Sequence, residues 1–131
     1  RLGVRRLIDQ GLCLPAVDRK PADAGRDWKP RELSSTEKTA HEAAVLPVDV
    51  AAISVGLLGD DVYLDLDYIL DSNADVDMNV IGTSDGMLVE VQGTGEESTY
   101  SRAQMDALMD MAEIGLKNLY AIQKQALDSA N

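Results

Sequence analysis

The stretch Val50–Leu58, VAAISVGLL, is a nearly continuous run of apolar residues, several of them β-branched. A short run of this composition is typical of a buried strand. Gly59-Asp60-Asp61 follows as a turn signal, and Val62–Asp67 can return as a hairpin partner. The sequence therefore predicts an antiparallel pair of strands at the centre of the fold.

Two further strands and a long helix are predicted after this pair. Met78–Thr83 and Met87–Gln92 flank Ser84-Asp85-Gly86, which is a strong hairpin turn signal. Ser101, with Gln104 three residues later, predicts the start of a helix that runs to about Leu127. Its mainly apolar stripe has i, i+3, i+4 spacing and comprises Met105, Leu108, Met109, Ala112, Leu116, Leu119, Tyr120 and Gln123. We therefore expect an α+β fold, in which a long C-terminal helix packs on an antiparallel four-stranded sheet.

The first 47 residues differ in character from the rest. Residues 1–14 hold a short apolar pattern with Gly11 as a C-cap, which predicts the end of a helix. Residues 15–47 contain all four prolines and many charges, and we interpret them as a polar insertion or linker. Within them a Ser34 capping box predicts a short helix to Val45. The third predicted region is residues 48–131.

Composition excludes several classes of protein. No apolar run approaches the roughly 18 residues that a membrane span requires. The single cysteine, Cys13, excludes a disulfide framework or a cysteine zinc site, so we expect a cytoplasmic protein. Cys13 is expected to be an apolar filler and His41 a surface residue. The chain begins with Arg1 rather than Met, and we expect it to be a fragment.

The net charge of −11 is unevenly distributed. Residues 1–38 hold nine Lys and Arg against six Asp and Glu, whereas residues 39–131 hold three against seventeen. An acidic surface repels a phosphate backbone unless a cation or a basic partner surface intervenes. Charge alone therefore disfavours nucleic-acid binding.

Three carboxylates lie in the stretch DSNADVDMNV, at Asp71, Asp75 and Asp77. A solvated loop, a structural turn and a metal-holding pair all remain open. Clustered carboxylates repel one another, and Mg²⁺ suits such a pair because it takes one or two carboxylates and keeps waters for a phosphate. The spacing of Asp71 and Asp77 is a weak signal by itself. No EF-hand spacing is present, which disfavours a calcium module.

The motifs of residues 50–127 are more specific. They include AAISVG (51–56), DLDY (65–68), the Asp71 and Asp77 pair followed by MNV (78–80), and VEVQGT (89–94). Asp65 and Asp67 of DLDY alternate with leucines and are expected on one solvated strand face. Together the motifs resemble the C-terminal half of the ribonuclease PH family, which comprises bacterial phosphorolytic 3′-to-5′ exoribonucleases.

This resemblance implies a fold, a reaction and a site. The fold would be the C-terminal half of the ribonuclease PH (ribosomal protein S5 domain 2-like) fold. The enzyme would be a nucleotidyltransferase in which inorganic phosphate, as co-substrate, releases nucleoside diphosphates from RNA during tRNA and rRNA processing. Asp71 and Asp77 would be catalytic and would bind Mg²⁺, with Asp75 in support. Family members are hexamers, and no membrane is involved.

The sequence also departs from the family pattern. The basic residues that hold phosphate and RNA in the family, including a Gly-Thr-Arg motif, belong to the N-terminal half and are not in this chain. The segment after Gly11 is much longer than usual, Leu70 replaces a common acidic residue, and the loop at residues 93–101 differs. The alternative hypothesis is therefore a truncated, catalytically inactive relative that acts only as an interaction or assembly module.

Overall fold

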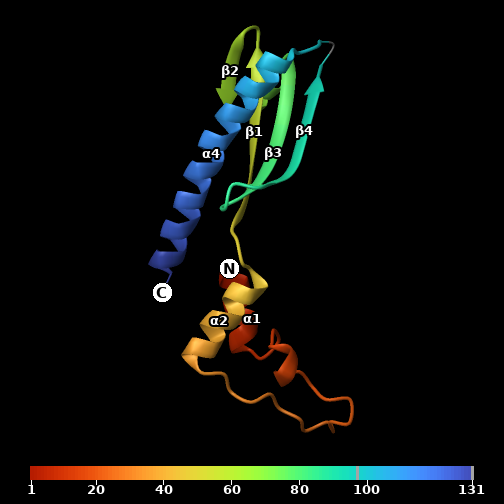
Figure 1. Cartoon of the computed structure of the whole chain (residues 1–131), viewed down its shortest axis with the longest axis vertical. Helices are drawn as coiled ribbons and strands as arrows, with labels where there is room; N and C mark the ends of the chain where they lie inside the picture. Colours follow the sequence, from red (N-terminus) through yellow and green to blue (C-terminus); the bar gives the residue numbers. More distant parts are fainter. Residues whose placement is uncertain (97, 131) are drawn as a thin grey trace. The chain divides into compact units, whose positions relative to one another are not determined.

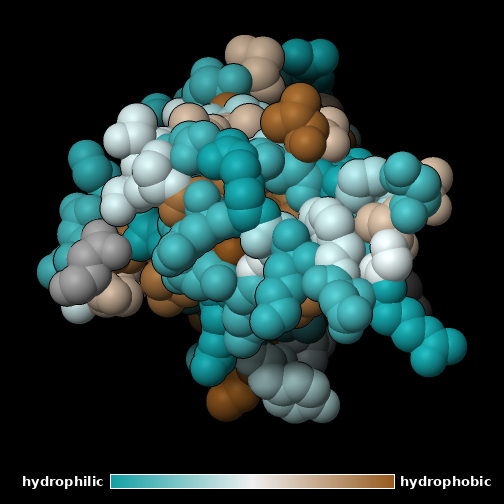
Figure 2. Space-filling view, turned by 90° about the horizontal axis from the view of Figure 1, so that it is seen from below, coloured by the Kyte–Doolittle hydropathy of each residue, from teal (hydrophilic) through white to brown (hydrophobic). Residues whose placement is uncertain are grey.

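The computed structural model describes residues 1–96 and 98–130, and these form two compact units, Arg1–Pro47 and Val48–Asn131. Glu97 of the loop at residues 93–101, and Asn131 at the end of the predicted region 48–131, lie outside the described residues. The face drawn in Figure 2 is mainly hydrophilic, with hydrophobic side chains scattered between. Within the described part of the chain, no helix is both long and apolar enough to cross a membrane.

The second unit is built on one four-stranded antiparallel sheet (Figure 1). The spatial order of the strands is β2-β1-β3-β4, so β1 and β3 lie at the centre. The strand bounds are Val50–Leu58 for β1, Asp61–Leu64 for β2, Val76–Thr83 for β3 and Leu88–Gly95 for β4. The hairpin β3–β4 turns at Ser84-Asp85-Gly86, where Gly86 has a φ of +88°. The predicted sheet and its long β1 strand are confirmed.

One long helix, α4 (Arg102–Ser129), covers one face of this sheet (Figure 1). It begins with the predicted capping box, because the Ser101 hydroxyl accepts from the Gln104 N–H and the Gln104 side chain accepts from the Ser101 N–H. The core lies between helix and sheet and consists of Ala51, Val55, Leu57, Val76, Met78, Val80, Leu108, Ala112 and Leu116. The predicted α+β architecture is therefore confirmed.

The second strand is shorter than predicted. Asp65 adopts a positive φ of 57°, which ends β2 after Leu64. Two residues later, the Asp67 carboxylate accepts from the Leu70 N–H at 2.9 Å and caps the one-turn helix α3 (Tyr68–Asp71). The prediction that Asp65 and Asp67 share one strand face is therefore wrong, because a turn and a helix cap replace the end of the strand.

The first unit holds three helical segments: α1 (Leu2–Asp9), the 3-10 turn η1 (Ala16–Asp18) and α2 (Ser35–Val45). The predicted capping box at Ser34 is present. Ion pairs join α1 to α2, since Arg5 Nε lies 2.7 Å from the buried Glu42 carboxylate and Lys38 Nζ lies 2.7 Å from Asp9. The stretch predicted as an insertion or linker therefore contains an 11-residue helix anchored to α1. Its origin as an insertion stays a prediction.

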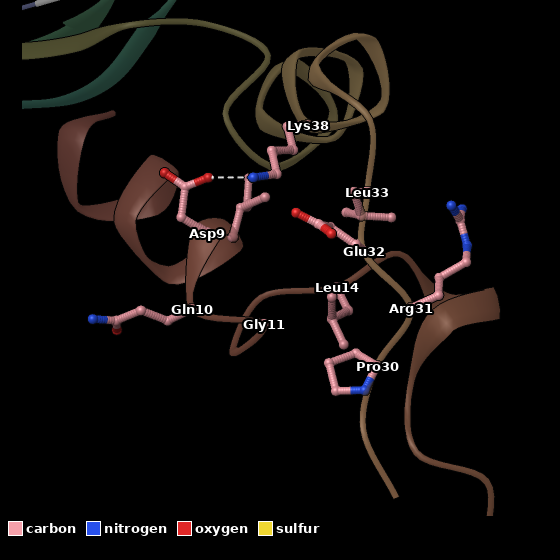
Figure 3. Close-up of a pocket in the computed structure, with 10 residues that line it drawn as sticks. Asp9, Gln10, Gly11, Leu14, Pro30, Arg31, Glu32, Leu33 and Lys38 are labelled. Carbon is pink, nitrogen blue, oxygen red and sulfur yellow. Dashed lines mark hydrogen bonds and ion pairs between the residues drawn. The ribbon is translucent and has the colours of Figure 1, made fainter.

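Figure 3 shows the Asp9–Lys38 ion pair beside a hollow of about 260 Å³ in this unit. Pro30, Leu14 and Leu33 contribute apolar walls, and charged side chains complete the lining. Gly11, the predicted C-cap, has a φ of +69° and packs against Pro30, where an added Cβ would come within 2.9 Å of the ring. A glycine is therefore required at this position for both conformation and space.

Candidate functional site

Asp77 lies near the start of β3, one of the two central strands. It pairs in register with Gly56 of β1 on one side and with Thr94 of β4 on the other. Its neighbours Val76 and Met78 are both buried, at 1% exposure, in the core beneath α4. Because side chains alternate along a strand, Asp77 projects from the opposite face of the sheet.

Asp71 is held by a different element, the short helix α3. Its backbone N–H donates to the Asp67 carbonyl at 2.8 Å, and its own carbonyl accepts from the Ala74 N–H at 3.2 Å. The Asn73 side chain closes the turn by donating to the Ile69 carbonyl at 2.7 Å. This turn reverses the chain between α3 and β3, so that the carboxylate of Asp71 comes within electrostatic range of Asp77.

The carboxyl group of Asp77 has a pKa raised above its ordinary value. Burial is the largest cause, followed by the negative charges of Asp71 and Glu96. Its Oδ1 is buried and has no hydrogen-bond partner among the described residues. Its Oδ2 is 3.4 Å from Asn79 Nδ2, which is a long contact. An ionised carboxylate in this position lacks the partners that buried charges require, and a cation would provide one.

Asp75, the third carboxylate of the stretch, has a structural contact. Its Oδ2 accepts from the Gly59 N–H at 2.6 Å, and its own N–H donates to the Leu57 carbonyl at 2.8 Å. The acidic loop is thereby tied to the turn between β1 and β2. Of the three interpretations of the stretch, a structural turn therefore describes Asp75.

Glu96 is a residue that the sequence reasoning missed. It follows β4, and its N–H donates to the Asp75 carbonyl at 3.0 Å. That contact places the negative charge of Glu96 near Asp77, and this charge contributes to the raised pKa of Asp77. No local signal in the sequence marks this residue, because its place depends on the register of β4 with β3, in which Gly95 lies opposite Val76. Among residues 1–96 and 98–130, however, no three His, Cys, Asp or Glu side chains are grouped so that they could hold a metal ion.

A hollow of about 210 Å³ lies in the same unit, between the β3–β4 turn and α4. Tyr120 lines it, and the buried Tyr120 hydroxyl has no partner in the part of the chain that the structure describes. Burial raises the pKa of this phenol, and the charges of Asp85 and Asp49 raise it further. The hollow is at the Thr83 end of β3, whereas Asp77 is at the other end.

Comparison with known proteins assigns the sheet and helix to a family. Residues 50–115 match the sequence profile described as the 3′ exoribonuclease family, domain 2. The chain belongs to this family. The matched range contains all four strands, both Asp71 and Asp77, and the first half of α4.

Curated relatives of the family match a similar range. Proteins named ribonuclease PH are 56% identical over 84 residues in Rhodopirellula baltica, 49% over 100 residues in Corynebacterium glutamicum and 55% over 91 residues in Bacillus cereus. These stretches cover 64%, 72% and 67% of this chain, respectively. They cover only 34%, 41% and 37% of the relatives, so the chain spans about a third to two fifths of the length of these proteins.

Proposed function

We propose that this exoribonuclease-family chain carries the acidic, metal-holding part of a phosphate-dependent 3′-to-5′ exoribonuclease. In this reaction, inorganic phosphate attacks the terminal phosphodiester of RNA, and a nucleoside diphosphate leaves. The observation that carries the proposal is the buried Oδ1 of Asp77, which has no partner among the described residues, together with the negative charge of Asp71 that acts on this carboxyl group. The name ribonuclease PH of the relatives supports RNA as substrate. We further propose precursors of tRNA as the RNA class.

Asp71 and Asp77 are the residues that would hold Mg²⁺. Two carboxylates suit this ion, which usually completes its coordination with water and substrate phosphates. Bound there, magnesium would polarise the scissile phosphate and offset its repulsion by the attacking phosphate. The protein's own part is to position the two carboxylates, Asp77 through the β-ladder and Asp71 through the α3 turn.

Other parts of a complete enzyme must supply positive charge. Residues 48–131 hold only Arg102, Lys117 and Lys124 as Lys or Arg, against sixteen Asp and Glu. Binding of phosphate and RNA therefore calls for a basic surface from the remaining length of the enzyme or from neighbouring subunits. We also propose hexameric assembly, which the family resemblance implies. We propose a cytoplasmic location as well, because Cys13 is a free thiol.

The alternative is a catalytically inactive module that acts only in interaction or assembly. A chimera separates the two candidates. In the Bacillus cereus relative, the matching stretch is replaced by residues 50–127 of this chain, and RNA with an unpaired 3′ tail is supplied with magnesium. We expect release of nucleoside diphosphates that requires inorganic phosphate. A folded chimera that releases none would contradict the proposal and favour the assembly module.

Two substitutions in the chimera test the site. Asp77→Asn keeps the shape of the side chain and removes its charge, so we expect RNA trimming to fall by at least about 100-fold, the range seen for groups that stabilise transition-state charge. Asp110→Asn is the matched control, because Asp110 is an exposed aspartate of α4. Calorimetric titration of the 131-residue chain with Mg²⁺ should show binding that Asp77→Asn abolishes and Asp110→Asn retains. Equal binding by all three proteins would disprove the metal assignment.

A further inference from the structure

The first unit contains a pair of side chains that the exoribonuclease site does not use. Cys13 Sγ lies 3.7 Å from His41 Nε2, within hydrogen-bonding distance for sulfur. Both residues are half-buried. The two residues are 28 positions apart in the chain, and the fold brings them together.

Several contacts hold the pair in place. The backbone N–H groups of Leu12 and Cys13 both donate to the Leu7 carbonyl, at 2.8 and 3.1 Å, which fixes the loop after α1. His41 lies on α2, and the next residue, Glu42, is buried and paired with Arg5 of α1 at 2.7 Å. The ion pair of Lys38 with Asp9 adds a second link between the two helices. The thiol and the imidazole therefore face each other from anchored elements.

A cysteine beside a histidine has a specific chemical use. A free thiol is only a few per cent thiolate near pH 7, and an adjacent base that takes its proton makes the sulfur a better nucleophile. The imidazole is such a base when its Nε2 carries no proton. We propose that Cys13 is a modification site, a thiol activated by His41 that reacts with hydroperoxides.

The sulfur of Cys13 attacks one oxygen of hydrogen peroxide, and the O–O bond breaks. The thiol proton passes through His41 to the departing oxygen, so that water leaves and cysteine sulfenic acid remains. The sulfur is oxidised and the peroxide is reduced. Because Cys13 is the only cysteine, the sulfenic acid has no second thiol in the chain with which to form a disulfide.

The test measures the rate of oxidation of the 131-residue chain. Hydrogen peroxide is added at pH 7, the sulfenic acid is trapped with dimedone, and the adduct is quantified by intact mass. The single cysteine makes every adduct attributable to Cys13. The reference is the same chain unfolded in guanidinium chloride, in which the thiol has no assistance. We expect the native chain to react about tenfold faster, within the limit set by the few per cent of thiolate in a free thiol.

Two variants assign the effect to the histidine. His41→Ala retains a strong helix former in α2, and we expect its rate to fall to that of the unfolded chain. Added imidazole should restore part of the rate in this variant and leave the wild-type rate unchanged. Thr36→Ala is the control, because Thr36 is an exposed residue of the same helix, and surface substitutions of this kind change stability little. It should react as the wild type does.

Two results of the oxidation experiment would overturn the proposal. A native chain that reacts no faster than the unfolded chain would overturn the proposal, even if His41→Ala did not fold. The proposal would also be overturned if the native chain reacted faster than the unfolded chain but His41→Ala, without added imidazole, reacted as fast as the wild type. The activation would then come from a group other than His41. Neither result bears on RNA trimming, so the outcome is independent of the proposed function.

Discussion

The carboxylate of Asp75 accepts a hydrogen bond of 2.6 Å from the backbone N–H of Gly59, sixteen residues earlier in the chain. This contact joins the acidic loop to the turn between β1 and β2, and it holds the start of β3 in position. The loop is thus fixed by one of its three acids, while burial and the negative charge of Asp71 raise the pKa of Asp77.

Replacing Asp75 with alanine should destabilise the second unit. The bond is charge-assisted and short, so we expect the free energy of unfolding to fall by about 1–2 kcal/mol. Urea unfolding followed by circular dichroism measures the change. The control is Asp110→Ala at an exposed position of α4, and this variant should stay within about 0.5 kcal/mol of the wild type. Equal effects of the two substitutions would show that the Gly59 contact adds no stability.

The raised pKa of Asp77 predicts a dependence of stability on pH. A carboxyl group with a folded-state pKa above its unfolded value binds more protons in the folded state, so its contribution to stability decreases as pH rises between the two values. Without divalent metal, Asp77→Asn should therefore be more stable than the wild type at pH 7. The difference should vanish below the ordinary value of 3.8. A difference that stays constant from pH 3 to pH 7 in urea unfolding would contradict this account.

Two apolar residues of α4 should respond very differently to truncation. Leu108 has no exposed surface, whereas Ile114, on the same helix, is 53% exposed. Leu108→Ala removes core contacts and leaves a cavity, and we expect a loss of about 2–5 kcal/mol. Ile114→Ala should change stability by no more than about 0.5 kcal/mol, because a truncated surface residue leaves no cavity. Chemical unfolding of both variants measures the two losses. If Ile114→Ala lost more stability than Leu108→Ala, the assignment of the buried face of α4 would be wrong.

Gly56 of β1 has no room for a side chain. A Cβ at this position would lie 2.9 Å from the carbonyl oxygen of Val76 in the neighbouring strand, and 2.6 Å from Leu66. The leucine can move, but the backbone oxygen belongs to the β1–β3 ladder. We expect Gly56→Ala to cost about 1–3 kcal/mol. Thermal unfolding tests this, and an unchanged midpoint would show that the two strands separate easily at this point.

Much of the fold follows from local sequence patterns. Val50–Leu58 reads as a buried strand because apolar residues fill both faces at the centre of the sheet, and Ser101 with Gln104 marks the helix start by side-chain chemistry alone. The end of β2 does not follow from these patterns. Apolar and acidic side chains alternate from Leu64 to Asp67, as they would in a strand. In the structure, the Asp65 N–H donates to the Ser54 carbonyl at 2.9 Å, but Asp65 has a left-handed conformation and the strand ends there.

The site was partly predictable for a similar reason. Asp71 and Asp77 are only six positions apart in the chain, so an interaction between their charges can be expected from the sequence alone. Glu96 and Gly59 come from distant positions, and their roles depend on the register of β3 with β4 and on the β1–β2 turn. The contact of Cys13 with His41 depends in the same way on the packing of α1 and α2. Tertiary register of this kind leaves no local trace in a single sequence.

The length of α4 has a consequence for its motions. Its 28 residues extend about 42 Å at the rise of an α-helix, whereas the nine residues of β1 extend about 30 Å. Buried α4 residues end at Leu116, and beyond Gln123, which donates to the Val50 carbonyl at 3.0 Å, the helix continues past the strands (Figure 1). Amide hydrogens around Leu108–Leu116 should therefore exchange with solvent only on global unfolding, while those of the last turns exchange through local fraying. One helix would thus report two different opening free energies.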